Sequence, residues 1–115
     1  MNAPASKANQ LERRLISFGA AILALSGKLP TTPQGRQICG HILRSGTAAA
    51  ANDGAARGAE SRADFIHKLK VVFKELNATT IWLEMIGESR LLPTETIVAI
   101  VAENPRMVPN YRGLD

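Results

Sequence analysis

Apolar residues recur at intervals of three or four along the most periodic segment of the chain. These residues are Phe65, Leu69, Val72, Leu76, Leu83 and Ile86. At about 100° per residue they fall within one narrow stripe of a helix surface, which Thr79 alone interrupts with a polar side chain. Ser61 followed by Asp64 resembles a capping box, whose side chains bond backbone N–H groups at a helix start. The pattern therefore predicts a long helix over residues 61–89.

Three shorter patterns predict three further helices. The first spans residues 8–27, and its apolar residues are Leu11, Leu15, Phe18, Ile22 and Leu25. The second spans residues 33–54 and carries two adjacent stripes of apolar or small residues. The stripes are Ile38, Ile42, Ser45 and Ala49, and beside them Cys39, Leu43, Gly46 and Ala50. The last spans residues 94–104, where Asn104-Pro105 ends it, and is less than half as long as the helix before it.

Length and composition agree with a helical protein. The 115 residues suffice for one domain with a modest core, and the aromatic content of 4% favours a helical bundle over a sheet. We predict an all-α fold, an antiparallel up-and-down four-helix bundle with a short fourth helix, as a single domain over residues 1–115. Residues 1–7 and 105–115 are expected to be irregular tails. The turn before the long helix is placed at Gly54 to Gly58.

The outward face of the long helix changes character along its length. Its first half is basic, whereas Ile81 and Met85 occupy its second half, with Trp82 on the flank. A helix that is apolar all round is normally covered all round. The two stripes of the second helix, one of which contains Cys39 and Leu43, likewise indicate burial from two sides. We therefore predict a homo-oligomer whose interface contains these five residues.

The alternative to an oligomer is a tail that covers the same surface within one chain. The apolar residues of this tail are Met107, Val108 and Tyr111.

The full chain has a net charge of +4, and its positive charge is concentrated in the first two-thirds. Residues 1–74 carry eleven Lys or Arg and four Asp or Glu, whereas residues 75–115 carry three and six. Such asymmetry is typical of a polyanion-binding surface, although basic residues are also the ordinary solvated face of a helix. The candidate nucleic-acid-binding residues are Arg13, Arg14, Arg44, Arg57, Arg62, Lys70 and Lys74. Because the few aromatic residues lie on apolar stripes or in the tail, we expect phosphate contacts with little sequence preference.

The sequence contains no catalytic signature. It lacks Gly-x-Ser-x-Gly, Ser-x-x-Lys and a glycine-rich phosphate loop. Asp64 and His67 have the spacing of a di-iron ligand pair, but no second copy of the pair exists and His67 lies on the outward face. We therefore expect no catalytic residue, no metal ligand, no cofactor, no small-molecule substrate and no enzymatic activity. The single cysteine, Cys39, lies in an apolar stripe and is interpreted as a structural thiol in a reducing compartment.

The N-terminal region has some features of a secretion signal. Arg13-Arg14 precedes an apolar run, as in a signal peptide. Against this, the run keeps a helical stripe, and Glu12 adjoins the arginines. The run is also shorter than the roughly 20 residues that span a bilayer. We expect a cytoplasmic protein with no membrane partner.

Several short segments resemble a known family. The segments are Arg44-Ser45, Asn52, Ser61, Asp64-Phe65-Ile66, Glu75 and Trp82-Leu83-Glu84. From about Leu11 to Leu92 the chain is similar to the small four-helix-bundle proteins named for 23S rRNA intervening sequences. Many members carry Asn-Ile-Ala-Glu-Gly where this chain has Asn52-Asp53-Gly54-Ala55-Ala56. A role attached to the acidic residue of that motif therefore has no counterpart at Ala55.

The resemblance implies an assembly and a ligand. Similar proteins form ring-shaped homo-oligomers, often of five subunits, and related accessory proteins of diversity-generating retroelements imply RNA as a partner. Members usually have a longer fourth helix, so the short one is a departure. We predict a non-enzymatic oligomeric bundle that binds RNA or another nucleic acid through a basic surface. The alternative is a protein-binding adaptor or structural oligomer with no nucleic-acid role.

Overall fold

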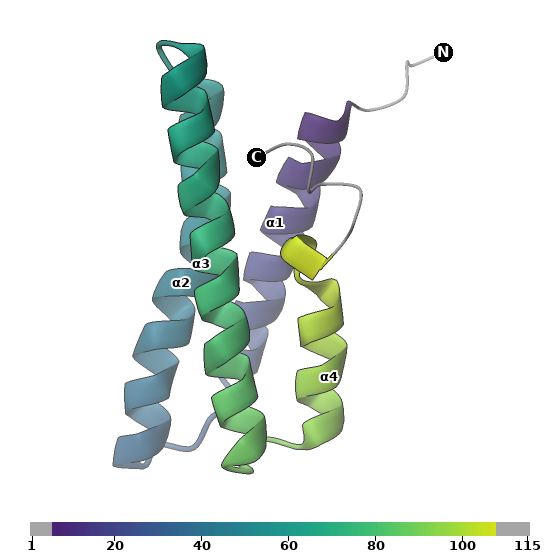
Figure 1. The fold of residues 1–115 in the computed structure, drawn as a ribbon. Helices are drawn as coiled ribbons and strands as arrows, with labels where there is room; N and C mark the ends of the chain where they lie inside the picture. The colour runs from purple at the N-terminus through teal and green to yellow at the C-terminus, as the bar shows by residue number, and fades with distance from the viewer. Residues whose placement is uncertain (1–5, 108–115) are drawn as a thin grey trace.

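Four antiparallel helices make up the part of the chain that the structure, a computed structural model, describes: residues 6–107 (Figure 1). The elements are α1 (Lys7–Ser26), α2 (Pro33–Arg57), α3 (Arg62–Glu88), α4 (Thr94–Glu103) and a 3-10 turn, η1 (Pro105–Met107). The α2 helix packs on both α1 and α3, and α4 packs on α3 and α1, so that α1 and α3 lie diagonally across the bundle. No strand occurs between residues 6 and 107. The predicted all-α fold with a short fourth helix is confirmed.

Serine side chains mark the start of two helices. The Ser61 hydroxyl accepts a hydrogen bond from the backbone N–H of Asp64 at 3.1 Å. The Asp64 carboxylate accepts in turn from the backbone N–H of Glu60 at 3.2 Å, one residue earlier than in a standard capping box. Ser6 begins α1 in the same way by accepting from the N–H of Asn9 at 3.1 Å. The predicted start of the long helix is therefore correct within one residue.

The α2 helix runs three residues beyond its predicted end at residue 54. Gly54 lies inside the helix, exposed, with open space where a side chain would be. One turn further on, the Arg57 side chain bonds the Asp53 carboxylate at 3.4 Å, an i,i+4 pair that supports the helix across Gly54. The helix ends at Gly58, so the chain reverses over residues 58–61 alone.

The core is built from one stripe of each helix. All five apolar residues predicted for the first helix are buried. On α3, five of the six predicted stripe residues are buried and Phe65 is half-buried. Thr79, the polar interruption, is also fully buried, and its hydroxyl lies 2.9 Å from the Ser45 hydroxyl of α2 and 2.8 Å from the Glu75 carbonyl oxygen. Because each hydroxyl can both donate and accept, the two buried polar side chains satisfy one another.

A missing side chain lets α1 and α2 approach closely at Gly46. A Cβ atom there would lie 2.7 Å from Cγ2 of Ile22, a fully buried side chain of α1. Gly19 faces the same point from α1, where its own Cβ would lie 3.6 Å from the Gly46 carbonyl oxygen. The Gly46 position therefore sets the distance between the two helices.

The end of α4 is held on α3 by a buried amide. Asn104 is fully buried, and its Nδ2 donates to the Leu76 carbonyl oxygen and the Thr80 hydroxyl, both at 2.9 Å. Its Oδ1 accepts from the backbone N–H of Arg106 at 2.9 Å, and the Arg106 guanidinium lies 4.7 Å from the centre of the Phe73 ring. The fourth helix is thus short but firmly anchored.

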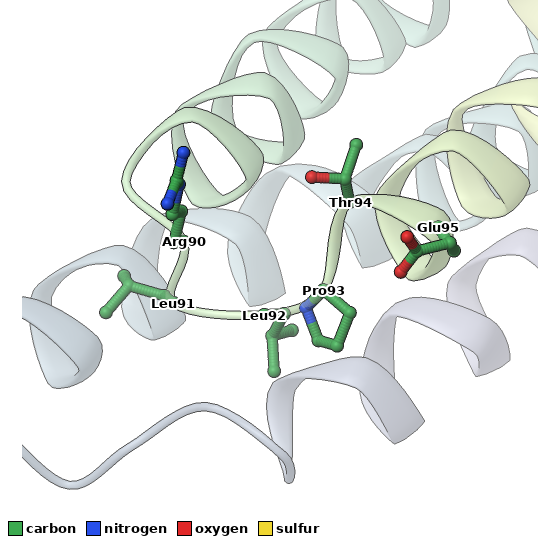
Figure 2. A pocket seen from close by; sticks show the side chains of 6 residues that line it. All are labelled: Arg90, Leu91, Leu92, Pro93, Thr94 and Glu95. Atoms are coloured by element: carbon green, nitrogen blue, oxygen red, sulfur yellow. The ribbon is translucent and has the colours of Figure 1, made fainter.

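The connection from α3 to α4 contains a strained residue. The backbone N–H of Leu91 bonds the Ile86 carbonyl at 3.1 Å and that of Arg90 bonds the Gly87 carbonyl at 3.1 Å, which together form a Schellman motif. This motif places Arg90 at φ 60°, a region that favours glycine. The loop borders a shallow pocket of about 460 Å³ lined by residues 90–95 (Figure 2).

A matched pair of glycine substitutions in α2 tests the close approach of α1. We expect Gly46→Ala to lower the free energy of unfolding by about 1–2 kcal/mol, because overpacking against Ile22 outweighs the gain of about 1 kcal/mol in helix propensity. Gly40→Ala, at an exposed position with open space, should raise it by about 0.5–1 kcal/mol. Urea unfolding of both variants measures the two values, and a stabilised Gly46→Ala would contradict the packing described.

Arg90→Gly tests the strain in the loop. We expect the substitution to raise the free energy of unfolding by about 0.5–1 kcal/mol. Glycine adopts the left-handed backbone without steric strain, and this gain exceeds the backbone entropy that glycine loses on folding. Arg90→Ala removes the same side chain and keeps the strain, so it should show no such gain. Equal thermal midpoints for the two variants would argue against the Schellman geometry.

Candidate nucleic-acid and assembly surfaces

The N-terminal half of α3 presents cations on its outward face. Lys70 and Lys74 are exposed and lie one helical turn apart, and neither makes an ion pair among residues 6–107. Arg62, near the start of the helix, extends this row of cations, and His67 is exposed on the same side. Lys68 differs, because it bonds the Asp64 carboxylate at 2.7 Å. The two unpaired lysines therefore carry positive charge that no neighbouring carboxylate offsets.

Arg44 forms an ion pair across α2 and α3. Its guanidinium lies 2.8 Å from the Glu75 carboxylate, with 63% of the Arg44 side chain but only 15% of the Glu75 side chain exposed. Pairs of this kind contribute at most about 1 kcal/mol to stability. Arg44 thus borders the α3 row while its own charge is partly offset.

Arg57 has a structural role that the sequence does not reveal. Its guanidinium lies 3.1 Å from the Glu12 carboxylate of α1, and it also donates to the Asn9 side chain at 3.1 Å and to the Ala8 carbonyl oxygen. With its bond to Asp53, Arg57 ties the end of α2 to the first turns of α1. Only 30% of the side chain is exposed. The charge of this candidate is therefore already matched by carboxylates.

Asp53 is a buried carboxylate beside Arg57. Burial raises its pKa above the ordinary value of 3.8, and the Arg57 guanidinium opposes the rise without cancelling it, while the negative charge of Glu12 adds to it. Ionised Asp53 therefore carries a desolvation penalty at neutral pH that its ion pair does not fully offset.

Arg13 and Arg14 lie on α1 and are exposed, with no ion pair among the described residues. Arg14 borders a depression of about 300 Å³ between α1 and α4, which Ser17, Phe18 and Glu103 also line. Because α1 and α3 are diagonal, the cations of these two helices occupy different sides of the molecule. A single chain therefore does not gather all seven candidates on one surface.

An apolar surface follows the cations along α3. Ile81 and Met85 are each 50% exposed. Trp82 is half-buried and stacks on His41 of α2, with ring centres 4.6 Å apart and planes inclined by 21°. The indole Nε1 of Trp82 is buried, and no atom of residues 6–107 accepts a hydrogen bond from it. Trp82 thus packs mainly within the chain, and Ile81 and Met85 are the exposed members of the predicted interface.

The other two predicted interface residues lie elsewhere. Cys39 and Leu43 are half-buried on the side of α2 that faces α1, where Cys39 Sγ lies 3.9 Å from the Ser26 carbonyl oxygen. The α1 helix therefore covers much of this stripe within the chain. The alternative prediction is that the C-terminal tail covers Ile81 and Met85. Its residues Val108 and Tyr111, and the side chain of Met107, lie outside the part of the chain that the structure describes.

Two exposed apolar residues on α1 were missed. Ile16 and Leu23 are 57% and 56% exposed. They are seven residues apart, which places them on one side of the helix, away from its buried stripe. This spacing was available in the sequence, but the stronger core stripe of the same segment concealed it.

Metal and membrane sites find no support in the part of the chain that the structure describes. Across residues 6–107, no three His, Cys, Asp or Glu side chains gather closely enough to bind a metal ion. Within the same range, each helix is too short or too polar to cross a bilayer.

The arrangement of four antiparallel helices defines a four-helix-bundle protein, and comparison with known proteins gives its family. No protein-family model and no curated protein matches the chain. Among solved structures, a protein of unknown function from the S23 ribosomal protein family of Bacteroides thetaiotaomicron superimposes with a TM-score of 0.82 and 32% identity. The match covers 89% of this chain and 91% of that chain. This chain therefore belongs to the S23 ribosomal protein family, the 23S rRNA intervening-sequence proteins that the sequence resembles.

The raised pKa of Asp53 predicts a specific pH dependence. Between pH 3.8 and the raised pKa, the folded state binds more protons than the unfolded state, so ionisation of Asp53 lowers the free energy of unfolding as pH rises. Asp53→Asn cannot ionise, and its stability relative to wild type should therefore increase with pH through this window and then level off. Urea unfolding over a pH series measures the difference.

Asp64→Asn is the control of opposite sign. A hydrogen bond from Lys68 and another from the Glu60 backbone lower the pKa of Asp64. Its ionised form favours the fold, so the stability of Asp64→Asn relative to wild type should decrease as pH rises. The same trend for both variants would contradict the buried environment of Asp53.

Proposed function

We propose that this protein is a non-enzymatic homo-oligomer that binds RNA weakly through cations on its surface. One observation supports this most. The outward face of α3 has Lys70 and Lys74, which make no ion pair among residues 6–107, in its first half, and exposed Ile81 and Met85 in its second half. The first half suits phosphate groups and the second half suits a protein surface. The sequence carries no catalytic signature, and the lack of enzymatic activity remains part of the proposal.

RNA is the polyanion that best fits these cations. Lysine ammonium groups on mobile side chains bind phosphates as point charges, with no preference for a base. Among residues 6–107, the stacked ring pair near this face is Trp82 on His41, so Trp82 is already engaged within the chain. Membership of a family named for a ribosomal protein supports RNA over other polyanions. The proposed binding is therefore sequence-tolerant and strongly dependent on salt.

Self-association would repeat the cations of one chain around the assembly. A fully buried apolar side chain contributes about 1.5–3 kcal/mol, so half-exposed Ile81 and Met85 would add roughly 1.5–3 kcal/mol together. Association costs about 4–15 kcal/mol in lost freedom, so these two side chains alone do not stabilise a contact, and apolar residues of the opposing copy must be buried with them. A closed ring, for which the resemblance implies five subunits, would add a second contact for each chain.

A protein-binding adaptor is the second candidate, and the exposed Ile81 and Met85 favour it. The two functions respond differently to salt. Phosphate binding weakens steeply as salt rises, whereas an apolar protein contact does not.

Charge reversal at Lys70 and Lys74 tests the RNA proposal. We expect Lys70→Glu/Lys74→Glu to weaken binding of a labelled single-stranded RNA by about tenfold or more at low salt, because two phosphate contacts become repulsive. The neutral variant Lys70→Gln/Lys74→Gln should make the slope of log K against log salt shallower by about 1.4. Fluorescence anisotropy over a salt series gives both values.

Lys28→Glu/Arg36→Glu is the matched control, since both residues are exposed, lack an ion pair among residues 6–107 and change the net charge equally. It should affect binding much less. Equal losses for the two charge-reversed variants would indicate a general effect of net charge, and no binding by wild type at low salt would refute the proposal.

A further inference from the structure

The α1 helix carries an exposed apolar surface of its own. Ile16 and Leu23 lie on one side of α1, more than half exposed. Half-buried Leu43 of α2 lies near the level of Leu23, because its neighbours along the same stripe, Cys39 and Gly46, contact α1 at Ser26 and Ile22. We call Ile16, Leu23 and Leu43 the α1 face.

The corresponding surface on α3 includes a groove. Ile81 and Met85 are half-exposed on the helix surface. Met85 also lines an open groove of about 470 Å³, together with the apolar side chains of Ile38 and Leu91. We call Ile81, Met85 and this groove the α3 face. Its projecting side chains and adjoining hollow suit a helix that itself presents protruding aliphatic side chains.

The two faces cannot cover one another within a chain. Ile16 and Leu23 belong to α1, whereas Ile81 and Met85 belong to the diagonally placed α3. All four side chains are at least 50% exposed, away from the shared core. A two-fold contact between α3 faces would leave the α1 face of both copies in water. A contact between the α1 face of one copy and the α3 face of another covers both faces. When this contact repeats from copy to copy, every chain makes two contacts in place of one.

We propose that the α1 face of one copy packs on the α3 face of the next copy. The inference rests on the self-association proposed above and names its second surface. Charges at the edges of the two faces agree with it: Arg13, one turn before Ile16, is exposed and unpaired, as are Glu84 and Glu88 beside Met85, among the described residues. The α1 face therefore has a positive residue at its edge, and the α3 face has negative residues beside it, so the two faces are complementary in charge.

Mixing two variants tests this pairing. Ile16→Glu/Leu23→Glu removes the α1 face, and Ile81→Glu/Met85→Glu removes the α3 face. Each variant alone should be a 12.4 kDa monomer, because each lacks one half of the contact. An equimolar mixture retains one intact pair of faces, so it should form a heterodimer of twice that mass and nothing larger. Light scattering coupled to size exclusion, at a chain concentration where wild type is assembled, gives the masses.

Other outcomes identify other contacts. If Ile16→Glu/Leu23→Glu still dimerises alone, the α3 face pairs with itself; if Ile81→Glu/Met85→Glu does so, the α1 face pairs with itself. Either result, or a mixture that stays monomeric beside an assembled wild type, overturns the pairing of unlike faces. A monomeric wild type would instead overturn the proposed self-association.

Two further sets of variants guard the interpretation. Ala99→Glu/Ala102→Glu adds the same charge to exposed positions of α4 and should leave the wild-type mass unchanged. Should a glutamate variant lose its helical circular dichroism, Ile16→Ser/Leu23→Ser and Ile81→Ser/Met85→Ser repeat the mixture with neutral side chains. The same heterodimer is expected from them, and its absence overturns the proposal.

Discussion

Simultaneous packing of α2 on α1 and on α3 is the constraint on which the bundle depends. The helix meets this constraint with small side chains: Gly46 admits Ile22 from one side, and Ser45 meets the Thr79 hydroxyl from the other. Since these two residues are adjacent in the chain, a larger residue at either would push one neighbouring helix away. The long α2–α3 pair then supports the much shorter α4, which Asn104 anchors to α3 (Figure 1).

Periodicity predicted the helices well because burial imposes it on every element. It gave the core of α1 correctly, and it placed Thr79 in the core although the residue is polar. It could not give the Ser45 partner, because spacing along one helix says nothing of the register between two. The same limit explains Arg57, whose carboxylate partner Glu12 is distant in the chain. Gly54 misled the prediction because a local propensity for turns was overcome by the helix around it.

The candidate surfaces were predicted in part. The change from basic to apolar along α3 follows from sequence alone, since both halves lie on one helix. Sequence alone did not show that Cys39 and Leu43 lie on a different side of the molecule from Ile81 and Met85. The two stripes of α2 are offset by one residue, and one faces α1 while the other faces α3. Exposed Ile16 and Leu23 show that an apolar pair outside the main stripe carries information. Such pairs on diagonal helices are the basis of the proposed contact between copies.

The central claim is that RNA binding requires the assembled protein. The most direct measurement compares the RNA affinity of wild type with that of the neutral variant Ile81→Ser/Met85→Ser, whose lysines and arginines are all intact. Measured at one chain concentration and physiological salt, with masses from light scattering, the variant should be monomeric and bind more than about tenfold more weakly. A monomeric variant that binds RNA as tightly as the assembled wild type would contradict the account.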